Sequence, residues 1–321
     1  MAKVIELHNL VKHFGEVHAV DGISFVVEKG EIFGFLGPNG AGKTTTIRCM
    51  MDFIRPTEGA IEILGKDAQK DSVSLKEKIG YLSDTPLFYG HWSVGKHFAF
   101  QQALRGCSKN LSNLLEKFDL NPKLRFSSLS SGNKRKLSII LALMNNPEIL
   151  ILDEPTLALD PLLQNAFHLY IENFAKTGGT VFMSSHNLSE VEKICDRVGI
   201  IKDGKMVAVE KISELKLMKM YDVSFHSENV NPKIFADKNT QIVSHTNGIV
   251  LLKVKGDINP LIKKLATVKL KDLEITHVSL EDIFMEFYSP QLNAFGNPAA
   301  ENSTAGLFNG ARIPSKQNKD N

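Results

Sequence analysis

The sequence predicts an α/β protein built around a parallel β-sheet, and three observations support this prediction. A strand is expected at residues 148–152, where Glu148 is followed by a continuous apolar run up to Asp153 that is typical of a strand buried on both faces. Strand patterns of this kind alternate with helical patterns along the chain, as in α/β proteins. A glycine-rich loop at residues 37–44 also connects a short expected strand to an expected helix.

The first two hundred residues supply most of the expected elements. Residues 3–35 alternate apolar and polar positions between glycines, which predicts antiparallel strands and turns. A short strand is expected at residues 31–36, and a helix at residues 43–53 ends near Pro56. The other expected elements are a strand at 60–65, mostly helical chain over about 87–145, the buried strand at 148–152, a helix at 162–176 and a buried strand at 180–183.

After about residue 215 the pattern changes to that of a small, separate α/β unit. Residues 242–254 predict a hairpin that turns at Asn247-Gly248. The other expected elements are strands at 221–226 and 273–278, a helix at 258–265 and a helix from Ser279, where Ser279 and Asp282 have capping-box spacing. Residues 290–321 are rich in Asn, Gly, Ser and Ala, which predicts a disordered tail. The expected domains are therefore 3–215 and 216–289.

The composition argues against several classes of protein. The net charge of +2 gives no indication of nucleic-acid binding. The three cysteines Cys49, Cys107 and Cys195 lie far apart, which argues against a disulfide framework or a zinc site. No apolar stretch approaches the ~20 residues that a membrane helix needs. We therefore expect a soluble, cytoplasmic chain, with any membrane span supplied by another polypeptide.

Residues 37–44 match the pattern G-x-x-x-x-G-K-[ST] between a strand and a helix. The glycines let successive backbone N–H groups face one anion, and the helix N-terminus adds its positive end. Lys43 is expected to reach the β- and γ-phosphates, and the Thr44 hydroxyl to bind Mg²⁺. The residues expected to contact the nucleotide here are Gly37, Pro38, Asn39, Gly40, Ala41, Gly42, Lys43, Thr44 and Thr45. The alternative is a glycine-rich turn that carries a lysine by chance.

The buried run at 148–152 ends in two carboxylates, Asp153 and Glu154. We expect Asp153 to hold Mg²⁺ and Glu154 to polarise the attacking water, because hydrolysis of a triphosphate depends on positioning and charge neutralisation. The alternative is an ordinary solvated turn after a strand. Together with residues 37–44, the pair favours ATP hydrolysis.

A further motif, Leu129-Ser130-Ser131-Gly132-Asn133, resembles the LSGGQ signature of the ATP-binding cassette (ABC) ATPases. Ser131 and Asn133 depart from that signature. The resemblance covers about residues 3–215. It implies a P-loop NTPase (RecA-like) parallel-sheet core, an antiparallel β subdomain and a helical subdomain at about 87–145. It also implies that Ser130 and Gly132 contact the γ-phosphate held by a second copy.

Other positions match the same family in order. Asp160 resembles the D-loop aspartate and His186 the switch histidine that contacts the γ-phosphate. Phe14 resembles the aromatic residue that stacks on adenine. The alternatives are a satisfied strand-end histidine for His186 and a core phenylalanine for Phe14. Asp84 stands where the family usually has glutamine, and we expect it to sense Mg²⁺, with a surface turn residue as the alternative.

The charge run Lys134-Arg135-Lys136 follows the signature. Such a run could indicate contact with nucleic acid. We expect instead a solvated helix face, and no nucleic-acid partner.

Residues 216–289, which contain Ser279-Leu-Glu-Asp-Ile-Phe, resemble the small unit that follows the cassette in ATPases of type-2 ABC exporters. This implies an ATP-hydrolysing subunit of a drug or antimicrobial-peptide exporter, with Mg²⁺ as cofactor. It implies two nucleotide-binding copies, attached to membrane-spanning permease subunits at the cytoplasmic face of the cell membrane. The alternatives are a soluble ABC protein of translation or DNA repair, and a regulatory ATP binder. The single cassette argues against the first, and the presence of Lys43, Asp153, Glu154 and His186 against the second.

Overall fold

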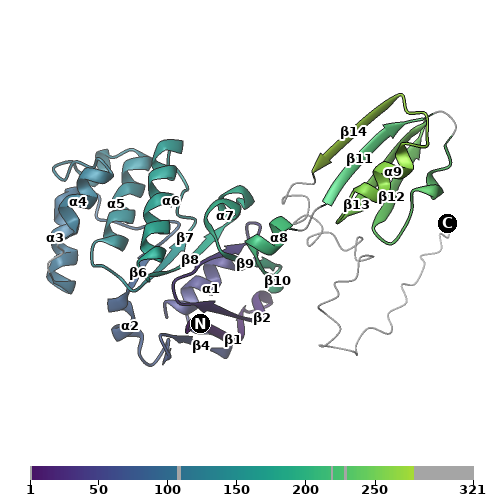
Figure 1. Cartoon of the computed structure of the whole chain (residues 1–321). Coiled ribbons are helices and arrows are strands. Elements are labelled where there is room, and N and C mark those ends of the chain that lie inside the picture. The colour runs from purple at the N-terminus through teal and green to yellow at the C-terminus, as the bar shows by residue number, and fades with distance from the viewer. Residues whose placement is uncertain (1, 107–109, 218–219, 228–229, 278–321) are drawn as a thin grey trace, which may run out of the picture.

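Three β-sheets organise the chain in the computed structural model (Figure 1). The structure describes residues 2–106, 110–217, 220–227 and 230–277. The strand orders are β2-β1-β4-β5 in the first sheet, β10-β9-β3-β8-β7-β6 in the second and β12-β13-β11-β14 in the third. The second sheet carries the residues of interest, and the first sheet packs against it.

The first sheet is antiparallel and is built from the N-terminal segment of the chain. β1 (Lys3–Phe14) pairs with β2 (Val17–Glu28) on one side and with β4 (Glu58–Ile63) on the other, and β5 (Lys66–Asp67) pairs with β4. This confirms the antiparallel strands predicted from the alternation of apolar and polar positions. The short strand predicted at 31–36 belongs to the second sheet.

The second sheet is the predicted parallel core. β3 (Ile32–Leu36) lies between β8 (Thr180–Ser185) and β9 (Arg197–Lys202), and β7 (Ile149–Asp153) continues the parallel order to β6 (Ile79–Leu82). Only the edge strand β10 (Lys205–Lys211), which pairs with β9, is antiparallel within this described sheet. The strand order places the chain segments after residues 36, 153 and 185 at neighbouring strand ends, where ligands of open α/β sheets bind.

Side chains of the parallel strands alternate between two apolar clusters, one on each face of the sheet. Phe33 and Phe35 face the first sheet and pack with Phe25 and Phe182, with ring centroids 5.3 to 5.9 Å apart. Ile32 and the other even-numbered apolar positions of β3 face the helices on the opposite side. Both faces are buried, which explains why these strands read as continuous apolar runs.

Helices flank the second sheet. They are α1 (Lys43–Met50), α2 (Ser72–Lys78), α3 (Val94–Arg105), α4 (Leu111–Lys117), α5 (Ser131–Leu143), α6 (Pro161–Lys176), α7 (Leu188–Ile194) and α8 (Ile212–Leu217), with a 3₁₀ turn η1 (Phe126–Ser128). The helix predicted at 43–53 ends earlier, at Met50. Among the described residues, every helix is too short or too polar to cross a membrane. In Figure 1, α3, α4 and α5 stand together at the end of the molecule away from the third sheet.

The third sheet is antiparallel and has its own buried cluster, which includes Val223, Phe225 and Leu261. Its elements are β11 (Met220–His226), β12 (Thr240–Thr246), β13 (Ile249–Lys255), β14 (Asp272–His277), α9 (Asn259–Leu265) and a 3₁₀ turn η2 (Pro232–Ile234). β12 and β13 form the predicted hairpin, and the turn residues Asn247 and Gly248 have φ values of 52° and 79°. The helix expected from Ser279 and the tail expected at 290–321 lie outside the described residues.

Candidate functional site

The loop at residues 37–44 joins β3 to α1, in the strand–loop–helix context that the sequence predicts. Gly42 has φ 107°, and a Cβ atom placed on it would lie 2.4 Å from the Ala19 carbonyl oxygen. A Cβ on Gly37 would lie 2.5 Å from the Ile201 carbonyl oxygen. Neighbouring backbone therefore excludes side chains at both glycines and holds the loop close to the first and second sheets.

Lys43 is the first residue of α1 and is 6% exposed. Its Nζ atom donates hydrogen bonds to the carbonyl oxygens of Gly37, at 2.7 Å, and Pro38, at 3.2 Å. The same ammonium lies 3.4 Å from Oε1 of Glu154. A buried cation thus lies within the curve of the loop, next to a carboxylate from a different strand.

Glu154 directly follows β7 and has φ 49°, a left-handed conformation that few non-glycine residues adopt. Its Oε2 lies 2.8 Å from Nδ1 of His186, which follows β8. Lys43, Glu154 and His186 therefore form one cluster, drawn from the ends of three neighbouring parallel strands. In this geometry Lys43 can attract an anionic ligand, and the neighbouring Glu154 carboxylate can accept a proton.

Asp153 is fully buried at the end of β7, opposite Ser184 of β8 in the parallel register. Ser184 donates its hydroxyl proton to Oδ1 of Asp153, at 2.6 Å, and accepts from the backbone N–H of Glu154, at 3.1 Å. Oδ2 of Asp153 has no hydrogen-bond partner. A buried carboxylate oxygen without a partner is costly unless a cation or a water completes it, so Asp153 fits the expected metal position.

The threonines of the first turn of α1 divide by burial. Thr46 is fully buried and donates its hydroxyl to the Gly42 carbonyl, at 2.9 Å. Thr44 and Thr45 are half-buried. Of the three predicted metal ligands, Thr44 is partly open to solvent and Asp153 carries an oxygen without a hydrogen-bond partner, while Asp84 lies elsewhere.

Three predicted nucleotide contacts lie at helix starts. Ser130 is exposed and caps α5, accepting from the Asn133 N–H at 3.3 Å. Asp160 caps α6, accepting from the Leu163 N–H at 3.0 Å. Within the described residues, no hydrogen bond or ion pair joins Ser130, Gly132 or Asp160 to the Lys43 cluster. The described part of one chain therefore does not bond the LSSGN motif, residues 129–133, to the Lys43 cluster.

Asp84 lies after β6 and not in the Lys43 cluster. It lines a cavity of about 180 Å³ together with Ser131, Leu157 and Ala158, and its Oδ2 accepts from the Thr85 hydroxyl at 3.3 Å. The structure therefore places the Asp84 side chain beside the LSSGN motif and the turn before α6. Its predicted contact with Mg²⁺ stays a prediction.

The expectation of a solvated face at Lys134-Arg135-Lys136 is wrong for Arg135. Lys134 and Lys136 are half-buried, but Arg135 is only 4% exposed. Its guanidinium donates to five backbone carbonyl oxygens, those of Ser83, Asp84, Asp153, Glu154 and Pro155. Burial lowers the pKa of Arg135, and the nearby carboxylates oppose that shift. The sequence around Arg135 does not reveal its burial, because the carbonyl oxygens that bind it come from distant segments of the chain.

Ser184 is the second functional residue that sequence reasoning missed. It joins Asp153 to the backbone of Glu154. Polar residues at the end of a fully buried strand, β8, were the available signal. Its role depends on the register between β7 and β8, which no local pattern reveals.

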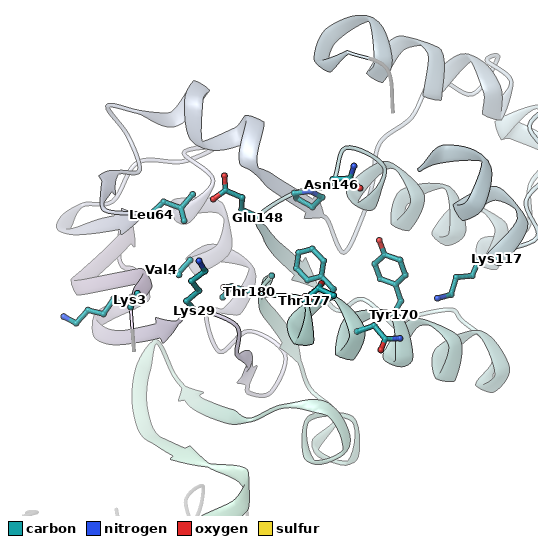
Figure 2. Close-up of a pocket in the computed structure, with 16 residues that line it drawn as sticks. Lys3, Val4, Lys29, Leu64, Lys117, Asn146, Glu148, Tyr170, Thr177 and Thr180 are labelled. Carbon is teal, nitrogen blue, oxygen red and sulfur yellow. The ribbon is translucent and has the colours of Figure 1, made fainter. Parts of the chain in front are cut away.

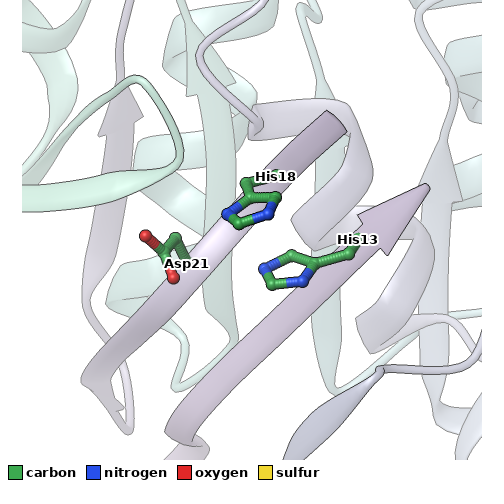
Figure 3. Close-up of side chains that lie close together, drawn as sticks. All are labelled: His13, His18 and Asp21. Carbon is green, nitrogen blue, oxygen red and sulfur yellow. The ribbon is translucent and has the colours of Figure 1, made fainter. Parts of the chain in front are cut away.

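Phe14 ends β1 and is 50% exposed, so it is not a core phenylalanine. Lys12 Nζ lies 4.8 Å from the centre of that ring. Nearby, His13 and His18 stack with ring centroids 3.8 Å apart and planes inclined by 11°, with Asp21 close to both (Figure 3). The lone pairs of parallel imidazoles do not converge on one ion, and Asp21 pairs with Lys205 at 3.3 Å, so this group does not form a preformed metal site.

A larger cavity, of about 780 Å³, lies at the other end of the parallel strands. Thr180, which begins β8, lines it, as does Glu148, which precedes β7 (Figure 2). Ligands of open α/β sheets bind at the carboxyl ends of the strands, not the amino ends. The Lys43 cluster is at the carboxyl ends, so the larger cavity is not part of this site.

The sequence matches the family model described as ABC transporter over residues 20–157. It is 33% identical over 299 residues to the bacitracin transport ATP-binding protein BcrA of Bacillus licheniformis, covering 89% of this chain and 97% of BcrA. It is 37% identical over 226 residues to the probable multidrug ABC transporter ATP-binding protein YbhF of Escherichia coli (strain K12), covering 68% of this chain. The chain spans only 39% of the length of YbhF.

A solved structure of an ATP-binding subunit of an ABC transporter is also similar. The TM-score is 0.63 and the sequence identity is 28%, over 66% of this chain and 92% of that chain.

Proposed function

Because this chain belongs to the ABC transporter family of ATP-binding proteins, we propose that it binds and hydrolyses ATP to drive export through separate membrane-spanning subunits. The observation that carries the proposal is the cluster of Lys43, Glu154 and His186 beside the buried Asp153. These groups supply a cation for the phosphates, a base for the attacking water and an imidazole next to that base.

In the proposed reaction, Lys43 turns from the loop carbonyls and from Glu154 to the β- and γ-phosphates. Glu154 then holds the attacking water and accepts its proton. His186, within hydrogen-bonding distance of the Glu154 carboxylate, orients that base and contacts the γ-phosphate. Phosphoryl transfer needs positioning and charge stabilisation more than covalent help from the protein, and these three residues supply both.

Mg²⁺ is the proposed cofactor. Thr44 and Asp153 would hold it, Thr44 through its hydroxyl and Asp153 through the oxygen that has no hydrogen-bond partner. When bound, the ion would neutralise part of the negative charge of the phosphates. Asp84 is the proposed sensor of that ion, from its position after β6 and beside Ser131 of the LSSGN motif.

A second copy of the chain would complete the site. Ser130 is exposed where it caps α5, so its hydroxyl is accessible to a partner subunit. We therefore assign Ser130 and Gly132 to the γ-phosphate of the partner's nucleotide, with Asp160 next to the interface and Phe14 on the adenine. ATP that contacts both copies favours the closed dimer over the open one.

The membrane subunits would contact the exposed apolar side chains between β6 and α4. Leu87 is 93% exposed, and Tyr89, Phe100 and Leu104 are also exposed. Exposed apolar side chains that gather in one region mark interaction surfaces. We propose that permease subunits cover this region at the cytoplasmic face of the membrane, and that the exported compounds are antibiotics of the drug or peptide class, as the names of BcrA and YbhF suggest.

Glu154→Gln tests the proposed reaction. The amide keeps the size of the side chain but cannot accept a proton, so the rate of ATP hydrolysis should fall about 10²–10⁴-fold while ATP still binds. The trapped variant should elute as a dimer in size-exclusion chromatography with ATP and Mg²⁺. Glu148 is an exposed carboxylate that pairs with Lys78, so Glu148→Gln is the matched control and should leave the rate unchanged.

Two outcomes would contradict the proposal. If the wild-type protein does not hydrolyse ATP in the presence of Mg²⁺, the proposed catalytic function is wrong. If the Glu154→Gln variant binds ATP but stays monomeric under these conditions, the proposal that a second copy completes the site is wrong.

A further inference from the structure

Arg135 is a buried cation whose hydrogen-bond partners are unusual for a charged side chain. All five acceptors of its guanidinium are backbone carbonyl oxygens, and among the described residues none is a carboxylate. A guanidinium has five N–H donors in a fixed plane, so these contacts use its full capacity. A side chain held this completely fixes the relative positions of the segments that it touches.

Three of the acceptors lie in succession around the proposed base. Nε donates to the Pro155 carbonyl at 3.0 Å, Nη2 donates to the Asp153 carbonyl at 3.0 Å, and Nη2 also donates to the Glu154 carbonyl. Glu154 has φ 49°, a conformation that the surrounding contacts must maintain. Arg135 therefore holds the turn that aims the Glu154 carboxylate at His186 and Lys43.

The other two acceptors lie where the chain leaves β6. Nη1 donates to the Ser83 carbonyl at 2.6 Å and to the Asp84 carbonyl at 3.3 Å. From here the chain runs through the exposed Leu87 and Tyr89 to α3. One planar group thus joins the turn of the catalytic carboxylate to the start of the segment that is proposed to contact the membrane subunits.

Arg135 also belongs to α5, the helix that Ser130 caps. Through these contacts, a shift of that helix or of residues 83–84 would displace the guanidinium that holds the carbonyls of residues 153–155. Lys134 and Lys136 on the same helix are half-buried, and neither donates a hydrogen bond to these carbonyls in the described structure. Arg135 is therefore the member of this charge run that connects the three segments.

We propose that Arg135 is a positioning residue that links residues 83–84 to the orientation of Glu154, and so regulates ATP hydrolysis from the membrane-facing side. This rests on the proposed function, since it assigns a role relative to Glu154 as base. The link acts through backbone carbonyls, which do not titrate.

The test uses the full chain with Arg135→Lys and Arg135→Gln. Lysine keeps the charge, but its single ammonium cannot span carbonyls on two segments, and glutamine offers two donors at most. For both variants kcat for ATP should fall about 100-fold, because a small misplacement of a catalytic group has an effect of this size. KM for ATP should change little, since Lys43 and the loop are untouched. Lys136→Gln, which removes a charge from the same helix, should leave kcat unchanged.

Two further measurements separate positioning from loss of fold. Titration with MgADP counts the folded sites, and kcat is expressed per site. Hydrogen exchange is then followed in peptides that cover residues 83–93 and 153–160. In the wild-type chain, ATP with Mg²⁺ should protect both peptides. In the Arg135 variants, ATP with Mg²⁺ should protect the peptide 153–160 from exchange but not the peptide 83–93.

The outcomes distinguish this inference from the proposed function. A wild-type chain without ATPase activity contradicts the proposed function. An active wild-type chain with Arg135→Gln equally active per site contradicts the positioning role. So does a variant that loses activity but keeps the joint protection of both peptides, because the link would then be intact.

Discussion

At the scale of single residues, the site depends on one hydroxyl as much as on its charged groups. Ser184 donates to Asp153 and accepts from the backbone of Glu154, so it holds the proposed metal ligand and the proposed base in one arrangement. The hydrogen bond occupies Oδ1 of Asp153, while Oδ2 has no hydrogen-bond partner. Each of the two carboxylates thereby has a defined direction before any ligand binds.

Asp84 provides a prediction at this scale. Its carboxylate lines the small cavity beside Ser131, while Arg135 binds only its backbone carbonyl. Asp84→Ala should keep the Arg135 contacts and remove the carboxylate. We expect ATP hydrolysis to fall about 10-fold and its requirement for Mg²⁺ to rise, as for residues that support a metal ligand. Titrating the ATPase rate with Mg²⁺ measures both effects.

The charge-matched partner of that variant is Asp84→Asn. It keeps the shape and an oxygen ligand, so it should be closer to the wild type than Asp84→Ala. If Asp84→Ala hydrolyses ATP at the wild-type rate over the whole range of Mg²⁺, Asp84 is a surface turn residue and not a sensor.

At the scale of elements, the phosphate loop is shaped by the sheets on either side of it. Gly42 and Gly65 both have positive φ values, 107° and 69°. A Cβ on Gly42 would lie 2.4 Å from the Ala19 carbonyl, whereas a Cβ on Gly65 meets nothing within 4 Å. The two glycines therefore share the conformational requirement and differ in the steric one.

Alanine substitutions at these glycines should differ in the free energy of unfolding. Gly65→Ala should lower it by about 1–2 kcal/mol, the cost of a left-handed conformation. Gly42→Ala should lower it by a further ~1–3 kcal/mol, because the loop or β2 must move to accommodate the methyl group. Urea unfolding without nucleotide measures the difference. Equal losses for the two variants would show that the close approach to Ala19 is easily relieved.

The elements that sequence reasoning found are those with a local signal. The turn at Asn247-Gly248 and the buried strand that ends at Asp153 are both present, because turn residues and apolar runs report on their own neighbourhood. α7, β9 and β10 were not among the expected elements, and the place of β3 between β8 and β9 has no local signature. Arg135 was misread for the same reason, since its partners are distant in sequence.

At the scale of the whole molecule, the third sheet is separate from the part that carries the site. Its buried residues form a cluster of their own, which shares no member with the two clusters around the second sheet. A unit with its own core can fold alone. This supports the division near residue 215, with the Lys43 cluster entirely on the N-terminal side.

A fragment of residues 1–217 tests that division. It should unfold cooperatively and hydrolyse ATP at a rate comparable to that of the full chain, because every residue of the proposed site is retained. Circular dichroism during heating and a steady-state ATPase assay are the measurements. A fragment that is folded but inactive would show that residues 218–321 contribute to the site.

The position of β3 has a consequence for how the chain is made. Gly30, just before β3, donates a hydrogen bond to Thr180 of β8, which lies 150 residues later. β9, the other neighbour of β3, follows later still. At a synthesis rate of roughly 5–20 residues per second, the time between the synthesis of β3 and that of both its partner strands is on the order of 10 s. The nascent chain therefore carries β3 without its two partner strands for that time, and the Lys43 cluster can assemble only after residue 186 has been made.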